Sequence, residues 1–287
     1  MQTVHTVTEL RAILDNWRQS GDKIAFVPTM GDLHEGHLSL VSAAKKQADR
    51  VVVSIFVNPL QFGENEDFDS YPRSLEHDSE KLQPHEVDLL FAPAVAAIYP
   101  DGLNNQTQVS VTAVSDTLCG ASRPGHFNGV ATVVSKLFNM VQPDIALFGE
   151  KDYQQLLVIR KLTSDLCFPV EIVGVETCRE VDGLAMSSRN RYLSESQRDV
   201  APALYRELRK AKKLIESGTV KDFGQLSELA CSSLSNSGFI PDYFEVRNAS
   251  NLAKPEAEDH DLLIFAAAWL GKARLIDNIR VSRGEKK

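Results

Sequence analysis

The stretch at residues 24–38 constrains the fold more than any other part of the chain, because its pattern is that of a strand that leads into a helix. Ile24–Val27 is a short apolar run typical of a buried strand, and Pro28, which has no N–H to donate to a neighbouring strand, is expected to end it. From about Glu35 onward, apolar residues recur at helical spacing. The stretch therefore predicts a strand, a short turn and a helix in close succession.

The turn in this stretch is a predicted anion site. Gly31 and Gly36 allow the backbone to bend tightly or to approach a ligand closely. The first N–H groups of the helix have no partner within the helix and lie at the positive end of its dipole, which favours a bound phosphate. His34 and His37 are three residues apart, so both can face that anion from the first helical turn.

The two histidines have other interpretations. A His-x-x-His pair is often a surface feature or a hydrogen-bonded core feature without chemistry. A zinc site is disfavoured, because the metalloprotease pattern spaces its histidines four apart on a helix, and no Cys or third His follows at ligand spacing. The strand–turn–helix context favours a catalytic role, and the structural interpretation stays open at this point.

Length and composition narrow the class of protein. A chain of 287 residues can bury a substantial core and is expected to form two domains. The net charge of −8 disfavours a broad basic face for nucleic acid. The N-terminus carries Glu9, Arg11 and Asp15, unlike a signal peptide, and the longest apolar run, Leu262–Leu270, is far shorter than a bilayer span. Four cysteines without metal or redox spacing predict reduced thiols and a cytoplasmic protein.

Strands and helices alternate through the first part of the chain. Near-continuous apolar strands separated by helices predict an α/β fold, a Rossmann-like parallel sheet with helices on both faces. Ligands of such sheets bind beyond the carboxyl ends of the strands, where the loops after residues 27, 57 and 148 are expected to converge. The expected strands are 24–27, 50–58, 87–91, 108–112, 144–148 and 170–175, and the expected helices are 8–18 (opened by Thr8), 35–49, 74–83, 94–98, 130–141 and 152–166.

The pattern changes after about residue 176. Helices expected at 195–217 and 222–236 are followed by three consecutive strands, expected at 242–248, 262–270 and 273–281. Helices followed by strands without alternation predict a small α+β domain. The expected domains are therefore residues 1–176 and 177–287.

Three further groups of residues carry candidate chemistry. Gly149–Asp152 follows a predicted strand and opens a helix, which places the charge of Lys151 beside a second helix N-terminus suited to phosphate. Met186–Arg189 offers two hydroxyls and a guanidinium to a triphosphate. The neutral amides of Asn58, Gln61 and Gln155 can bind hydroxyl and carboxylate oxygens without adding charge. Each group taken alone is also typical of a solvated turn or surface.

Taken in order, these motifs resemble the pantoate–β-alanine ligase family, and the resemblance extends from about residue 22 to residue 281. The segments that carry it are Val-Pro-Thr-Met-Gly-Asp-Leu-His-Glu-Gly-His (27–37), Ser-Ile-Phe-Val-Asn-Pro-Leu-Gln-Phe (54–62), Tyr-Pro-Arg (71–73), Arg-Pro-Gly-His-Phe-Asn-Gly-Val (123–130), Gln-Pro-Asp-Ile-Ala-Leu-Phe-Gly-Glu-Lys-Asp (142–152) and Met-Ser-Ser-Arg-Asn (186–190).

The resemblance implies an activity. The family belongs to the nucleotidyltransferases that share a His-x-x-His signature with class I aminoacyl-tRNA synthetases. It condenses pantoate with β-alanine through a pantoyl adenylate, uses ATP and Mg²⁺, and releases AMP and pyrophosphate. The resemblance also implies a homodimer in which the smaller domain closes over the ATP site.

The resemblance further implies site residues. His37 takes the family's general-acid role, His34 lies against the phosphates, and Lys151 and Arg189 complete the catalytic set. Gln61 and Gln155 match pantoate ligands, with Gln61 also near β-alanine. Asp32 and Met186 stand where Asn and Leu are more frequent, and no protein ligand of the metal is implied. The ATP-binding positions are Met30, Gly31, Asp32, Leu33, His34, Glu35, Gly36, His37, Gly149, Glu150, Lys151, Asp152, Cys178 (through its main chain), Met186, Ser187, Ser188 and Arg189.

Alternative activities remain in view. A nucleotidyltransferase that joins AMP or CMP to a phosphorylated substrate would need a second cationic site, whereas the candidate substrate side here is rich in Gln and Asn. A tRNA synthetase is disfavoured by the net charge of −8 and the short C-terminal region. A nucleotide-binding protein without catalysis would use the same histidine turn.

Overall fold

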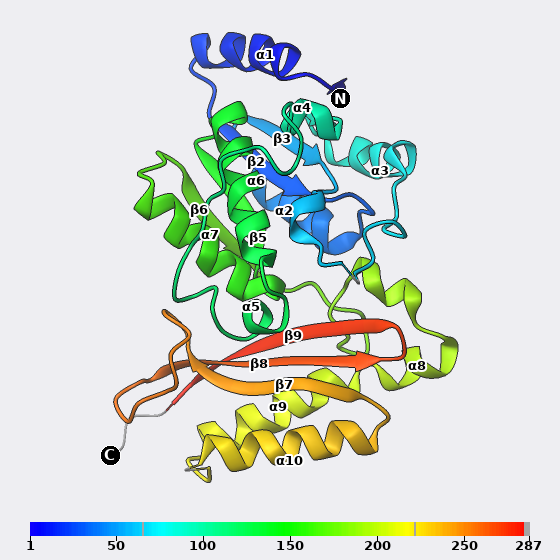
Figure 1. Cartoon of the computed structure of the whole chain (residues 1–287), viewed down its shortest axis with the longest axis vertical. Helices are drawn as coiled ribbons and strands as arrows, with labels where there is room; N and C mark the ends of the chain where they lie inside the picture. The colour runs from blue at the N-terminus through cyan, green and yellow to red at the C-terminus, as the bar shows by residue number, and fades with distance from the viewer. Residues whose placement is uncertain (65, 221, 284–287) are drawn as a thin grey trace. The chain divides into compact units, whose positions relative to one another are not determined.

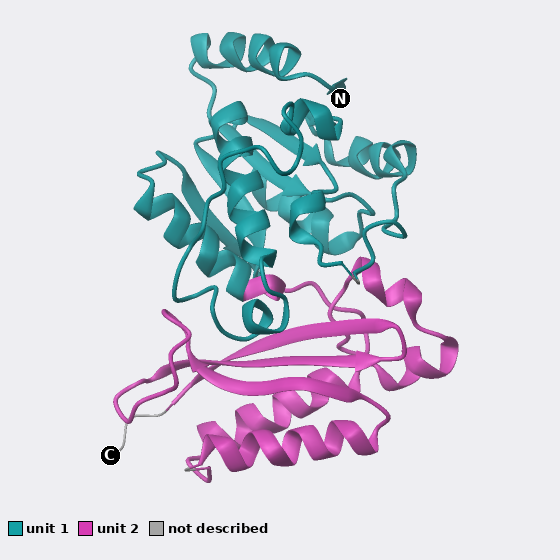
Figure 2. Ribbon diagram, in the orientation of Figure 1, with its two compact units in different colours: residues 1–150, 154–176 teal, residues 151–153, 177–287 magenta. Residues whose placement is uncertain are grey.

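The computed structural model describes residues 1–64, 66–220 and 222–283. The chain forms two compact units, coloured separately in Figure 2. Unit 1 comprises residues 1–150 and 154–176, and unit 2 comprises residues 151–153 and 177–287. The short segment Lys151–Tyr153 thus groups with unit 2 although the chain on either side of it belongs to unit 1.

Unit 1 is built on a six-stranded sheet with the order β1-β4-β3-β2-β5-β6, and every neighbouring pair is parallel (Figure 1). This confirms the predicted α/β fold. The sequence analysis missed β1, a three-residue edge strand that is too short for a periodic signal. The strands are β1 Gln2–Val4, β2 Ile24–Thr29, β3 Arg50–Ile55, β4 Leu89–Phe91, β5 Ile145–Gly149 and β6 Glu171–Val175.

Helices cover both faces of this sheet. On one face Ala25, Val51 and Ile145 form a buried cluster with Leu38 and Val41 of α2. On the other face Phe148 of β5 meets Phe138 of α6, with ring centroids 6.4 Å apart. The helices of this part of the chain are α1 Val7–Gln19, α2 Glu35–Lys45, α3 Leu75–Leu82, α4 Val95–Ile98, α5 Cys119–Ser122, α6 His126–Val141 and α7 Tyr153–Asp165, with short 3₁₀ turns η1 Pro59–Gln61, η2 Gln83–His85 and η3 Glu150–Asp152.

Two predictions for the first elements of the chain, the start of α1 and the end of β2, were wrong. Helix α1 is opened by Thr6 rather than Thr8, because Thr6 accepts the N–H of Glu9 and forms a capping box with that residue. Strand β2 does not end at Pro28 but runs through Pro28 to Thr29. Strand β5 pairs with β2 only at Ala25 and Phe26, so at Pro28 the strand has β3 as its one neighbour and a missing donor is tolerated.

The strand predicted at 108–112 is also wrong. Among the residues that the structure describes, the segment has no strand partner, and the N–H of Val109 instead donates to the side chain of Thr132 on α6, at 2.9 Å. Strand β3 ends at Ile55, earlier than predicted, because Asn58 caps the 3₁₀ turn η1. Helix α2 ends at Lys45 rather than near residue 49, and α6 begins four residues before its predicted start.

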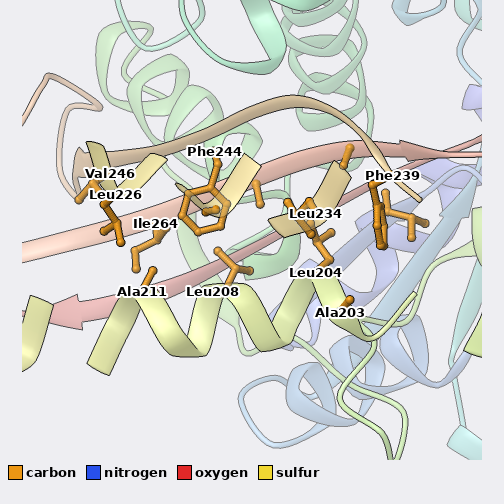
Figure 3. Close-up of a cluster of buried hydrophobic side chains, with 14 of the residues drawn as sticks. Ala203, Leu204, Leu208, Ala211, Leu226, Leu234, Phe239, Phe244, Val246 and Ile264 are labelled. Carbon is orange, nitrogen blue, oxygen red and sulfur yellow. The ribbon is translucent and has the colours of Figure 1, made fainter. Parts of the chain in front are cut away.

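Unit 2 is the predicted small α+β fold. Its antiparallel sheet has the order β7-β8-β9, and α9 and α10 pack against one face of it through Leu208, Leu234 and Phe244 (Figures 1 and 3). The single helix predicted at 195–217 is two helices, because Pro202 has no N–H with which to continue the first. The elements are α8 Glu195–Val200, α9 Ala203–Glu216, α10 Phe223–Asn236, β7 Ile240–Asn248, β8 Asp261–Leu270 and β9 Ala273–Ser282, with the 3₁₀ turn η4 Ser188–Tyr192.

Candidate functional site

The histidine turn follows β2, beside the point where the strand order of the sheet reverses between β2 and β5. In open parallel sheets this reversal is where ligands bind. The chain turns at Gly31 and Asp32, which have φ values of 82° and 51°. His34 then caps α2, because its Nδ1 accepts the N–H of Gly36 at 3.1 Å, and Nδ1 of His37 accepts the N–H of His34 at 3.3 Å.

This capping arrangement brings the two imidazoles together as predicted, with ring centroids 4.2 Å apart. Each Nδ1 faces a backbone N–H, so in the neutral form each ring carries its proton on Nε2. The turn thus offers two imidazole donors in addition to the helix N-terminus, which is a suitable environment for phosphate oxygens.

Helix α3 holds this turn through Asp78, a site residue that the sequence analysis missed. The carboxylate of Asp78 accepts the N–H groups of Asp32 and Leu33, each at 2.8 Å, and Nζ of Lys81 donates to the carbonyl of Leu33 at 2.5 Å. A Cβ on Gly31 would lie 2.9 Å from Asp78 Oδ2, so this position requires glycine. The available signal was that Asp78 shares the apolar face of its helix with Leu82, four residues on.

Asn58 orients Gln61 instead of meeting a ligand. Its Oδ1 accepts from the backbone N–H of Leu60 at 3.3 Å and from the hydroxyl of Tyr99 at 2.7 Å. Its Nδ2 donates to the backbone carbonyl of Gly129 at 3.1 Å and to Oε1 of Gln61 at 3.0 Å. Burial raises the pKa of Tyr99, so its hydroxyl stays a donor. Because the two backbone groups fix the direction of the Asn58 amide, Gln61 must present its NH₂ group as the free end.

The segment Arg123–Val130 supports the same glutamine. Arg123 forms an ion pair with Glu66, and Nδ1 of His126 lies 2.8 Å from the carbonyl oxygen of Gln61. Burial raises the pKa of Glu66, but the Arg123 guanidinium outweighs this effect and leaves the pKa below its ordinary value. A Cβ on Gly129 would lie only 2.3 Å from the carbonyl oxygen of Leu60, so α6 and η1 touch backbone to backbone.

The segment after β5 carries Lys151 and Gln155. Lys151 lies in η3, its ammonium group 3.9 Å from the Asp152 carboxylate, and Gly149 and Glu150 precede it directly. Gln154 is buried and structural, since its amide binds the N–H of Cys119 and the carbonyl of Val114. The side chain of Gln155 makes no hydrogen bond within residues 1–64, 66–220 and 222–283, which leaves its amide available.

In unit 2 the remaining predicted ATP positions lie on one hairpin and the turn that follows it. The carbonyl of Cys178 accepts the N–H of Met186 at 3.0 Å, so these two positions face each other. Ser187 caps η4 by accepting the N–H of Arg189 at 3.3 Å, and Ser188 begins that turn. Lys151 and Ser187 line one small hollow of this unit, so the structure brings these two predicted residues together.

In unit 1 the structure places the turn at Met30–His37, the η1 residue Gln61 and the α7 residue Gln155 after β2, β3 and β5. These strands are adjacent and parallel, so all three groups follow the carboxyl edge of the sheet, as predicted. Across the described ranges, no set of three or more His, Cys, Asp or Glu is grouped as a metal site, and no helix there has the length and apolarity needed to cross a bilayer. The four cysteines are free thiols.

Fold and site together define an α/β protein with an anion-binding turn at the carboxyl edge of a parallel sheet and neutral amide donors beside it. The Pantoate-beta-alanine ligase family profile matches residues 2–280. The chain therefore belongs to the pantoate–β-alanine ligase family.

Individual relatives agree with this assignment over their full length. The chain is 56% identical to pantothenate synthetase of Shewanella oneidensis over 283 residues, covering 99% of this chain and 100% of the relative. It is 57% identical to pantothenate synthetase of Pseudomonas putida (strain GB-1) over 286 residues, covering 100% of this chain and 99% of the relative.

Solved structures show the same fold. Pantothenate synthetase from Thermus thermophilus superposes with a TM-score of 0.90 at 48% identity, over 97% of this chain and 99% of that one. Pantoate-beta-alanine ligase from Francisella tularensis, in complex with beta-gamma ATP and beta-alanine, superposes with a TM-score of 0.82 at 35% identity, over 97% of each chain.

Proposed function

We propose that this protein condenses (R)-pantoate with β-alanine to give pantothenate, with cleavage of ATP to AMP and pyrophosphate. Membership of the family over residues 2–280 supports this function, and the observation that carries it in the structure is the capped histidine turn at the carboxyl edge of the sheet. The Francisella relative binds an ATP-type nucleotide and β-alanine, which are two of the three proposed substrates.

The chemistry requires activation of a carboxylate, which is a poor acylating agent. One carboxylate oxygen of pantoate attacks the α-phosphorus of ATP, the bond to the bridging oxygen breaks, and pyrophosphate leaves, giving pantoyl adenylate. The amine of β-alanine then attacks the acyl carbon and displaces AMP. Neither step needs a covalent bond to the protein, so positioning and charge stabilisation suffice.

The proposed roles follow from the donors of unit 1. His34 and His37 donate from Nε2 to phosphate oxygens, and His37 is the general acid as negative charge grows on the leaving pyrophosphate. Gln61 donates its NH₂ group to an oxygen of pantoate, which Asn58 ensures by occupying the other end of the amide. Gln155 offers a second neutral amide to pantoate. Donors without net charge bind the carboxylate and hydroxyls without quenching the nucleophile.

We further propose that the nucleotide contacts Met30–His37, Gly149–Asp152, Cys178 and Met186–Arg189. Lys151 and Arg189 supply positive charge for the triphosphate, and the hydroxyls of the serine pair add neutral donors. In this proposal residues 1–176 form the ATP- and pantoate-binding domain, and residues 177–287 form the domain that closes over the nucleotide.

We propose that Mg²⁺ binds together with ATP and is held mainly by the triphosphate. Mg²⁺ typically keeps several waters and binds through substrate phosphates with one or two carboxylates, and the described residues contain no cage of three acids, cysteines or histidines. The histidine turn contains two acids, Asp32 and Glu35, which are the residues of the turn that would hold the ion on the protein side. When bound, the ion neutralises part of the phosphate charge.

We also propose an oligomeric state and a cellular location for this protein. A homodimer in the cytoplasm accords with the family resemblance and with four free thiols. Sedimentation equilibrium with a mass near twice 31.8 kDa would support the dimer, and a mass of one chain at micromolar concentration would refute it.

Isotope exchange tests the proposed function. With ATP, Mg²⁺ and pantoate present and β-alanine absent, labelled pyrophosphate should enter ATP, because the first step is reversible. A nucleotide-binding protein without catalysis would show no exchange, and an enzyme acting on a phosphorylated substrate would show none with pantoate. Exchange that appears only after β-alanine is added would exclude the adenylate mechanism.

A further inference from the structure

Unit 2 contains a buried ion pair that the proposed chemistry does not use. Asp277 on β9 is bound by Arg179 through two parallel bonds, Nη1 to Oδ2 at 2.6 Å and Nη2 to Oδ1 at 2.9 Å. The Asp277 side chain is 3% exposed and that of Arg179 18%. Burial raises the pKa of Asp277, and the Arg179 guanidinium opposes this effect. A buried pair of this kind contributes little net stability, so its presence calls for another reason.

Arg179 organises the hairpin that carries the nucleotide positions of unit 2. Its Nη1 also donates to the carbonyl of Gly183 at 3.2 Å, and its backbone pairs with Ala185 across the hairpin. The guanidinium lies over the ring of Tyr205, 3.7 Å from the ring centre. Gly183 has a φ of 93°, and a Cβ there would lie 2.7 Å from Tyr205 Cδ1. The ion pair therefore fixes the loop that joins Cys178 to Met186.

The residue after Asp277 reaches the Lys151 segment. The backbone N–H of Asn278 donates to Oδ1 of Asp277 at 2.8 Å, and its side-chain Nδ2 donates to the carbonyl of Lys151 at 2.9 Å. Asp277, Lys151 and Ser187 line the same small hollow. Two consecutive residues of one strand thus hold both the hairpin and the lysine segment.

We propose that Arg179, Asp277 and Asn278 are positioning residues that set the spacing between Lys151 and the serine turn Ser187–Arg189. The inference rests on the proposed function, in which those groups bind ATP. In this inference the three residues act through Lys151 and the serine turn, and they hold these ATP-binding groups in place before the nucleotide arrives. Preorganisation of this kind lowers the cost of binding, and small displacements of positioned groups reduce rates strongly. The parallel two-bond geometry also requires arginine, because lysine cannot supply it.

Steady-state kinetics of Asn278→Ala and Arg179→Lys test this inference. Each variant should raise the KM for ATP by roughly 10- to 100-fold, because a displaced phosphate-binding group loses much of its contribution. The KM for pantoate should stay within about twofold, since the pantoate residues lie in unit 1. Asp261→Asn is the matched control: this carboxylate also pairs with an arginine, Arg280, in the same sheet, but the two side chains are 54% and 57% exposed. The control should leave both KM values unchanged.

The measurements distinguish an incorrect positioning role from an incorrect enzymatic function. If the function is wrong, the unmodified protein shows no pantoate-dependent pyrophosphate exchange. If only the inference is wrong, the folded Asn278→Ala protein shows an unchanged KM for ATP, or equal increases for ATP and pantoate. Melting temperature is measured alongside, because a purely structural role would lower it without a selective effect on ATP. If Arg179→Lys fails to fold, the result for Asn278→Ala decides, since this variant removes a neutral side chain and no charge.

Discussion

At the scale of single residues, the site is defined by which end of a polar group faces outward. In unit 1, hydrogen bonds to backbone groups determine which end of each imidazole and each amide faces outward. The N–H groups of His34 and Gly36 occupy Nδ1 of the two imidazoles, and Leu60 and Gly129 fix Asn58, which in turn fixes Gln61. The sequence identified these residue types as donors, but it carried no information on their direction, because that depends on partners far away in the chain.

Replacing Gln61 by Glu tests the direction of its amide. Glutamate keeps the size of the side chain and the bond from Asn58, but puts an oxygen where the NH₂ group lies. A carboxylate at this position repels the carboxylate of pantoate and cannot donate the hydrogen bond proposed for the NH₂ group. The KM for pantoate should therefore rise by roughly 100-fold or more, with the KM for ATP little changed. An unchanged KM for pantoate would show that Gln61 does not donate to this substrate.

Replacing His37 by Ala tests the imidazole donor. The variant loses one bond of the capping box, which costs about 1 kcal/mol of stability and leaves the fold intact. Pyrophosphate exchange should fall by roughly 100- to 1000-fold, as for loss of one preorganised donor to a developing charge. His77→Ala, at a side chain that is 60% exposed, is the control and should retain activity. Near-normal exchange in folded His37→Ala would remove this residue from the mechanism.

At the scale of secondary-structure elements, strands that carry an apolar run were predictable, whereas the edge strand β1 was missed and the segment 108–112 was wrongly predicted to be a strand. Strands β2, β3 and β5 appear near their predicted positions, since their burial shows in the sequence as an apolar run. Strand β6 also lies near its predicted position, although its residues are only partly buried or exposed. The segment 108–112, Gln-Val-Ser-Val-Thr, alternates polar and apolar residues as a strand can, but Val109 bonds to a threonine on α6. Strand β1 is too short to show a pattern and is defined by its pairing with β4. In both cases tertiary contacts, rather than the local sequence, determined whether a strand formed.

The contact between α6 and η1 gives a prediction about the glycine at its centre. Gly129→Ala would bring a methyl group to within 2.3 Å of the Leu60 carbonyl, so η1 must shift and carry Gln61 with it. Overpacking of this kind costs about 1–3 kcal/mol, and the KM for pantoate should rise as well. Gly63→Ala is the control, because its Cβ would meet atoms no closer than 3.7 Å. Equal melting temperatures and KM values for the two variants would contradict this account.

The Glu66–Arg123 pair predicts a pH dependence for the loop that follows η1. The pKa of Glu66 is lowered in the folded protein, so the pair stabilises the fold above the ordinary pKa of about 4.5, and this contribution disappears as pH falls through the lower folded value. Glu66→Gln should therefore lower the melting temperature at pH 7, and the difference from the unmodified protein should vanish at strongly acidic pH. A difference in melting temperature that persists or grows in acid would contradict this mechanism.

At the scale of the whole molecule, alternation of strands and helices predicted the parallel sheet, and its loss after residue 176 predicted the smaller α+β fold. The sequence did not indicate that Lys151–Tyr153 groups with the second unit, because Asn278 holds that segment from a strand more than a hundred residues away. Likewise, the pairing of Arg179 with Asp277 has no local signature. The order of strands and helices along the chain predicts the layers of the fold, whereas contacts between residues far apart in the sequence are visible only in the structure.

The two units allow a last prediction that separates the substrates. The proposed nucleotide residues occur in both units, at 30–37 and at 151, 178 and 186–189, whereas the proposed pantoate residues Gln61 and Gln155 occur in unit 1 alone. A ligand at about 100 times its Kd stabilises the state that binds it by about 2.7 kcal/mol, which slows exchange of amides that open with that state by roughly 100-fold. Hydrogen–deuterium exchange should therefore show ATP protecting residues 30–37 and 178–189, and pantoate protecting only segments of unit 1. Asn278→Ala should weaken protection by ATP around residue 151 and in the serine turn, at a fixed ATP concentration, more than in the histidine turn. Protection by ATP confined to unit 1 would show that the second unit does not hold the nucleotide, and protection by pantoate in unit 2 would remove the separation of the two substrates.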